Sequence, residues 1–151
     1  MLDIHNSAQL SHLLNQLQPK ESPVFGAFSA QGMIEHLYLS LQISNGNLPQ
    51  TLHFPERKAE IIKQRLIHSP NEIPVGFKSP IVPDLPPPLI FESIEMAKTN
   101  LLTALSNFHQ FFLENPDAKP MNPTMGELNK TEWETFHTKH FTHHFKQFKL
   151  I

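Results

Sequence analysis

Apolar residues in the middle of the chain recur every three or four positions, which is the spacing of one face of an α-helix. The clearest such stripe predicts a helix from about Ile90 to Glu114. It consists of Ile90, Ile94, Ala97, Leu101, Ala104, Leu105, Phe108 and Phe112. No stretch alternates apolar and polar residues for long enough to predict a sheet. The pattern therefore predicts an all-α protein.

Four other helices are expected from apolar spacing and from residues that favour helix ends. The expected ranges are Asn6 or Ser7 to about Gln18, the segment from Ser29 to the Asn45-Gly46-Asn47 cluster, Glu56 to Ile67, and Thr131 to about Phe148. Ser29 is a good N-cap, and Pro55 fits the first position of a helix. Thr131 and Glu134 have the spacing of a capping box, which predicts that the last helix begins there.

Residues 68–88 contain seven prolines, which fix the backbone φ angle and remove hydrogen-bond donors. These prolines are at positions 70, 74, 80, 83, 86, 87 and 88. We expect an extended loop here. Four main helices with otherwise short connections, together with this long proline-rich loop, predict an up-and-down four-helix bundle. A chain of 151 residues predicts one domain, spanning residues 1–151.

Composition narrows the class of protein and its partners. The chain has no cysteine, which excludes disulfide bonds and sulfur ligands for zinc. Residues 1–18 lack the basic and apolar regions of a signal peptide, and no apolar run reaches the roughly 18–20 residues of a membrane span. The formal net charge is −2, and the 12 Lys and Arg residues are scattered. We therefore expect a cytoplasmic protein with no membrane and no nucleic-acid partner.

Histidines are concentrated in the expected last helix, which holds four of the ten in the chain. A helical wheel places His137, His140 and His144 in the middle of the apolar stripe of that helix, where a bundle usually has leucine. The residues placed opposite this stripe are Lys139, Thr142, Lys146 and Lys149. The three histidines are therefore expected to face the protein interior.

Three buried imidazoles need compensation, because an unpartnered buried polar group costs roughly 1–3 kcal/mol. A divalent metal ion compensates directly by accepting neutral imidazole nitrogens. His140 and His144 stand one turn apart on one helix face, which is the spacing that two ligands of one ion need. His36, on the inward side of the expected second helix, is the best candidate for a third ligand, and His109 is the reserve. Three histidines with one position open form the pattern of a reactive site.

Other interpretations of these histidines stay open at this point. His36 alone is more often a core or edge histidine, and His140 and His144 alone fit a polar core equally well. All three could also hydrogen-bond to one another through water. His137 is expected to support a ligand or line a pocket, and His143 to be structural. The histidines expected in solvent are His5, His12, His53 and His68.

Two motifs near the ends of the chain are typical of one known group of proteins. Residues 25–37 read FGAFSAQGMIEHL, residues 126–133 read GELNKTEW, and residues 139–148 read KHFTHHFKQF. The chain resembles the DinB/YfiT-like metalloenzyme superfamily in these motifs, and the C-terminal motif resembles that of an uncharacterised subgroup. The proline-rich residues 68–88 are not part of the general pattern of the superfamily.

The resemblance implies a four-helix bundle, often a homodimer, with a metal on one histidine of the second helix and a His-x-x-x-His pair of the last helix. Carried over to this chain, the metal ligands are His36, His140 and His144. Characterised relatives use the metal to activate a low-molecular-weight thiol for transfer or isomerisation.

Two classes of function fit the sequence. In the first, the chain is an enzyme whose divalent ion, zinc or nickel, activates water or a thiol for attack on a small-molecule substrate, and His137 or His109 carries a proton. Thiol transfer and hydrolysis both fit. In the second, the chain is a non-catalytic module that binds a small ligand or dimerises, with a structural metal or none. A pocket reaching an open coordination position favours the enzyme, whereas a fourth protein ligand favours the module.

Overall fold

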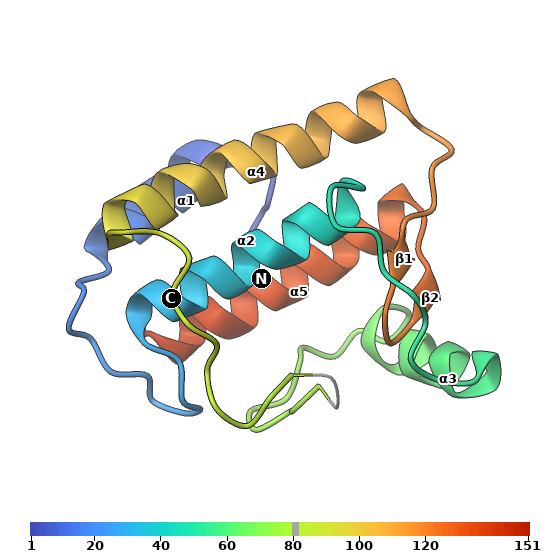
Figure 1. The fold of residues 1–151 in the computed structure, drawn as a ribbon, viewed down its shortest axis with the longest axis horizontal. Coiled ribbons are helices and arrows are strands. Elements are labelled where there is room, and N and C mark those ends of the chain that lie inside the picture. The colour runs from blue at the N-terminus through green and yellow to red at the C-terminus, as the bar shows by residue number, and fades with distance from the viewer. Residues whose placement is uncertain (80–81) are drawn as a thin grey trace.

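The computed structural model describes residues 1–79 and 82–151, and within them the chain is mostly helical (Figure 1). The helices are α1 (Ser7–Gln16), α2 (Ala30–Ser44), α3 (Glu56–Leu66), α4 (Ile94–Glu114) and α5 (Lys130–Gln147). A short antiparallel pair, β1 (Met121–Asn122) and β2 (Gly126–Glu127), lies between α4 and α5 in the sequence. The helical content agrees with the predicted all-α class.

The core lies where α2 packs between α4 and α5 (Figure 1). α2 contributes fully buried apolar residues to it, α4 contributes its predicted stripe from Ile94 onward, and α5 contributes aromatic rings. The residues of this core that are at most 2% exposed include Met33, Ile34, Leu37, Leu41, Leu101, Leu105, Phe108, Phe112, Phe141 and Phe145. With this face of α2 turned to the core, the side that carries His36 faces α5.

The direction of α4 differs from the predicted up-and-down order. α2 and α4 run the same way in Figure 1, and α5 runs the opposite way. Glu35, near the start of α2, accepts hydrogen bonds from the backbone N–H groups of Ile90 and Phe91, just before α4, at 2.7 and 2.9 Å. The chain between α2 and α4 includes α3 and the proline-rich segment. Because this connection is long, the chain can return from the end of α2 to the end of the helices where α2 began, so that α4 runs in the same direction as α2. A short connection would make α4 run in the opposite direction.

Several helix ends also differ from the predicted ones. The capping box of α5 is formed by Asn129 and Glu132 rather than by Thr131 and Glu134. Asn129 is as good an N-cap as threonine, and its side chain accepts a hydrogen bond from the Glu132 N–H at 3.0 Å. α4 begins at Ile94 instead of Ile90, because the Ser93 side chain caps it and Glu35 holds the preceding residues. α1 ends at Gln16, two residues earlier than expected.

Two residues on the polar side of α5, Lys139 and Thr142, are buried, although the wheel placed them opposite the apolar stripe, whereas Lys146 and Lys149 on the same side are exposed. Thr142 accepts a hydrogen bond from the Leu2 N–H at 2.9 Å, so the N-terminal segment covers this side. Lys139 is 3% exposed and donates to the carbonyls of Leu66 and Ser69 at 2.8 and 2.7 Å. The end of α3 therefore covers the other part. α5 is enclosed on most sides and forms the centre on which the site is built.

The described part of the proline-rich segment, residues 68–79 and 82–88, contains no helix and no strand. Pro80 lies outside the described residues. The first half of the segment runs along α5, where Lys146 contacts Glu72 at 2.6 Å and the Ile73 carbonyl lies 3.2 Å from His143 Nδ1. This segment is thereby held beside the histidines of α5. None of the described helices is both long and apolar enough to cross a membrane.

Candidate metal centre

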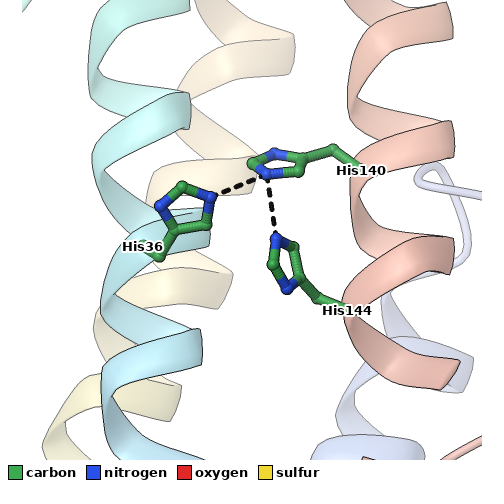
Figure 2. A group of neighbouring side chains, drawn as sticks. All are labelled: His36, His140 and His144. Carbon is green, nitrogen blue, oxygen red and sulfur yellow. Dashed lines mark hydrogen bonds between the residues drawn. The ribbon is translucent and has the colours of Figure 1, made fainter. Parts of the chain in front are cut away.

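His36, His140 and His144 meet between α2 and α5, as Figure 2 shows. Nε2 of His140 lies 2.9 Å from Nε2 of His36 and 3.2 Å from Nε2 of His144. The three rings therefore point the same kind of nitrogen at one place. The three residues proposed as ligands are brought together, and the group could hold a metal ion.

Burial keeps the three imidazoles neutral. Loss of solvation, with a smaller contribution from His143, lowers the pKa of His36 to about 4. Loss of solvation, with smaller contributions from His36 and His143, lowers the pKa of His144 to about 3. Burial also lowers the pKa of His140 well below its ordinary value, with contributions from His144 and His36. At neutral pH each ring therefore carries one N–H group and one free lone pair.

Gln147 orients the ring of His144. The Gln147 side-chain amide donates through Nε2 to the Phe25 carbonyl at 2.7 Å, which directs its oxygen toward the histidine. His144 Nδ1 lies 2.8 Å from this oxygen and donates to it. The proton is then on Nδ1, and the lone pair of Nε2 points to the centre of the group. Gly26 permits this arrangement, because with its φ of 77° a Cβ atom there would lie 2.6 Å from Gln147 Nε2.

Ser40 acts on His140 in the same way. The Ser40 hydroxyl donates to the Leu37 carbonyl at 2.9 Å, so its oxygen is left as an acceptor. His140 Nδ1 lies 3.4 Å from that oxygen, which favours the proton on Nδ1 and the lone pair on Nε2. Two of the three inward nitrogens are thus set as acceptors by neighbouring side chains. Facing lone pairs need a cation or a proton donor between them.

The donor set fits a divalent cation of the zinc type. Two nitrogens bound at about 2.0–2.1 Å to a tetrahedral ion lie roughly 3.3 Å apart, and the distances of 2.9 and 3.2 Å between the Nε2 atoms are close to that value. Among the described residues, no carboxylate belongs to the group. Three neutral protein ligands leave one tetrahedral position for a non-protein ligand.

A cavity of about 580 Å³ reaches this group. All three histidines line it, together with residues of α2, α3, α5, the loop before α2 and the described residues of the proline-rich segment. Phe28 packs on His36 with a centroid distance of 4.9 Å. Ligand sites commonly have volumes of about 300–1,000 Å³. The metal position and the cavity therefore form one candidate site.

His137 and His109, considered as proton carriers from the sequence, lie elsewhere. His137 is fully buried, stacks on Trp133 at 5.4 Å, and donates from Nε2 to Ser44 Oγ at 2.8 Å. His109 donates to the Ile4 carbonyl at 3.1 Å on the other side of the core. Neither is among the described residues that line the cavity. The geometry does not bring either imidazole to the open side of the group, so their catalytic role stays an untested prediction.

His143, expected to be structural, lines the cavity as well. Its ring lies 5.1 Å from that of Phe25, and its Nδ1 bonds the Ile73 carbonyl. His5, expected in solvent, has a side chain that is 56% exposed. It forms a second group with His109 and Glu134. That group is less suited to an ion, because Lys130 lies 3.8 Å from the carboxylate and the two rings stack.

Two supporting residues were not assigned a role from the sequence. Gln147 is three positions after His144, a spacing that places it on the same face of the helix and could have identified it as the residue that orients the ring. Glu35 is 4% exposed and accepts from the Gln31 side chain and from two backbone N–H groups. Its partners lie 55 and 56 residues away in the sequence, so no local pattern could have revealed them.

One family model matches almost the whole chain. It covers residues 1–150 and is described as "Protein of unknown function (DUF1569)". Comparison with curated proteins and with solved structures gave no match.

Stability should depend on pH through His137. Burial lowers its pKa from 6.5 to about 3, so between these values the unfolded chain binds a proton that the folded chain does not. The stabilisation is therefore complete above pH 6.5 and is lost as the pH falls below it. In metal-free protein, His137→Gln should reduce the slope of unfolding free energy against pH by about 1.4 kcal/mol per pH unit between pH 6 and 4. Urea denaturation measures this slope.

Above pH 7.5, His137 is neutral in both states, so the difference in stability between wild type and His137→Gln should be constant there. This constant difference serves as the control for the loss of the Ser44 hydrogen bond. Equal slopes below pH 6 would mean that His137 is not buried in its neutral form.

Proposed function

The chain belongs to DUF1569, a family of proteins of unknown function, and we propose that it is a metal-dependent enzyme whose divalent ion is held by His36, His140 and His144. The observation that carries the proposal is the convergence of three neutral Nε2 atoms from residues that line one cavity. A structural ion would favour a fourth protein ligand and a closed centre. The three-histidine group with its adjoining cavity supports a reactive site instead.

Imidazole ligation suits zinc and nickel, and we propose one of these as the ion. Such an ion, when bound, acts as a Lewis acid and lowers the pKa of a water or thiol that occupies its free position. The protein residues around the ion orient its ligands and shield one side of the group from water. Gln147 and Ser40 hold two of the ligand rings in the binding tautomer, and Phe28 and Phe136 exclude water from one side of the group. The cavity lined by these three histidines would hold the small-molecule substrate next to the ion.

The reaction class is that of a hydrolase or a thiol transferase. Both need only a nucleophile generated at neutral pH next to a bound substrate. The described residues offer no carboxylate in the metal group, so we assign no general base. We also propose that α1, α2, α4 and α5 form the four-helix scaffold of the DinB/YfiT type. A homodimer and a cytoplasmic location stay predictions of the sequence.

The metal content of the untagged protein tests the ligand set. Purified wild type, reloaded with Zn²⁺ or Ni²⁺ and desalted, should carry close to one ion per chain by elemental mass spectrometry. His36→Ala and His144→Ala should each lower this content by about tenfold or more, because each removes one of only three protein ligands. His12→Ala is the matched control, since His12 is exposed on α1 and should leave the content unchanged.

The second histidine group provides a further discrimination. If His5→Ala removed the ion and His144→Ala did not, the ion would belong to the group of His5, His109 and Glu134. Wild type that stays metal-free after reloading would contradict the catalytic proposal itself.

Gln147 should act on metal affinity without being a ligand. Gln147→Met keeps the size of the side chain but removes the acceptor for His144 Nδ1, so zinc affinity should fall by about 10–100-fold. Gln147→Glu restores an acceptor and should recover most of the loss. Competition with a chromogenic chelator measures both. An unchanged affinity in Gln147→Met would show that the tautomer of His144 is set in another way.

A further inference from the structure

We propose that the cavity beside the three histidines binds a small molecule with an uncharged, apolar body and a single metal-binding head group. This inference rests on the proposed function for its head group, whereas the apolar body is argued from the cavity alone. It specifies the substrate class that the family description leaves unassigned.

The body of the cavity is lined by apolar side chains from four separate parts of the chain. Phe25 and Phe28 come from the loop before α2, Ile43 from α2, Ile62 from α3, and Phe136 from α5. Apolar groups gain about 0.8 kcal/mol for each methylene removed from water. A wall of this composition therefore favours aliphatic or aromatic groups.

The polar side chains that line the cavity are largely engaged with the protein. Gln147 uses its amide for His144 and Phe25. The Ser40 hydroxyl donates a hydrogen bond to the Leu37 carbonyl. The side-chain oxygen of Asn122 accepts hydrogen bonds from the backbone N–H groups of Thr124 and Met125 in the same turn. A polar ligand body would lose its hydration here and gain few partners, which is costly.

The charged side chains that line the cavity, other than histidines, are highly exposed and therefore lie at its rim. Apart from histidines, the described lining residues include only Lys78 and Asp84 as charged side chains, and these are 83% and 94% exposed. They lie 3.8 Å from each other, so their charges offset one another. Nothing among the described residues would compensate a charge on the inner part of a ligand. The group of His36, His140 and His144 is the exception, because a metal ion held there would favour a ligand with a donor atom that coordinates it.

The cavity volume of about 580 Å³ suits a molecule larger than the smallest metabolites. Affinity should therefore increase with ligand length until the space is filled. Linear alkane hydroxamic acids from two to eight carbons are suitable probes, because their common head group chelates divalent metals and their tails differ only in length. Trp133, the one tryptophan of the chain, lines the cavity and reports on its occupancy by fluorescence.

In titrations of zinc-loaded protein, affinity should increase about fourfold with each added methylene over the first several members of the series. An eight-carbon probe with a terminal ammonium or carboxylate group should bind at least tenfold more weakly than its uncharged counterpart. Affinity that is independent of tail length, or equal for charged and uncharged tails, would overturn the proposal.

Two adjacent isoleucines of α3 provide a matched pair of variants. Ile62 lines the cavity, whereas its neighbour Ile61 is 46% exposed and is not among the described lining residues. Ile62→Lys should weaken the eight-carbon probe by at least tenfold and leave the two-carbon probe unchanged. Ile61→Lys should change neither. Equal effects of the two substitutions would contradict the assigned cavity.

Failure of the proposed function can be distinguished from failure of this inference. Linear alcohols of the same lengths have no chelating group, so they test the apolar body in metal-free protein. Length-dependent binding of alcohols to a chain that takes up no metal would overturn the proposed enzyme and support the apolar cavity. Metal uptake without length-dependent binding of either series would support the metal site and overturn the apolar cavity.

Discussion

The central constraint of this molecule is that three neutral imidazoles bring their Nε2 atoms together inside the protein, with those of His140 and His144 set as acceptors. Nε2 of His140 lies within 3.2 Å of its counterparts in both His36 and His144. Burial lowers the pKa values of these histidines enough to keep them neutral at neutral pH. An unsatisfied buried acceptor costs about 1–3 kcal/mol. A divalent cation satisfies the acceptors of His140 and His144 and can take His36 as a third ligand, which is the geometric basis of the metal proposal.

The surrounding fold maintains this constraint through hydrogen bonds that connect distant parts of the chain. Gln147 links His144 to the loop before α2, and Gly26 leaves room for its amide. Glu35, one residue before His36, fastens the start of α4 to α2. Lys139, one residue before His140, fastens the end of α3 to α5. The same contacts that place the histidines therefore also hold the walls of the cavity in position.

Local sequence patterns predicted the parts of this arrangement that depend on single helices. The 3.6-residue period gave the main helices, and the four-residue spacing gave His140 and His144 on one buried face. His36 followed because it lies on the inward side of α2. The burial of Lys139 and Thr142 was not predictable from α5 alone, because the segments that cover them come from Leu2 and from the end of α3.

Other features were missed because they depend on segments that are distant in the sequence or because two local patterns were equally good. The direction of α4 follows from a long connection whose course no periodicity encodes. His109 resembled a reserve ligand because it flanks the stripe of α4, yet it faces the Ile4 carbonyl away from the group. The cap of α5 was misplaced by two residues, since Asn129 and Glu132 match the capping pattern as well as Thr131 and Glu134 do. The cavity arises only when the loop before α2, the proline-rich segment and three helices meet.

The most direct test of the three-histidine metal site is the position of the metal in crystals of the reloaded protein, located by anomalous scattering at the absorption edge of the added ion. One strong anomalous peak is expected between α2 and α5, about 2.0–2.1 Å from Nε2 of His36, His140 and His144, with the remaining coordination position facing the cavity. A peak at His5, His109 and Glu134 alone, or a fourth protein ligand that closes the centre, would contradict it.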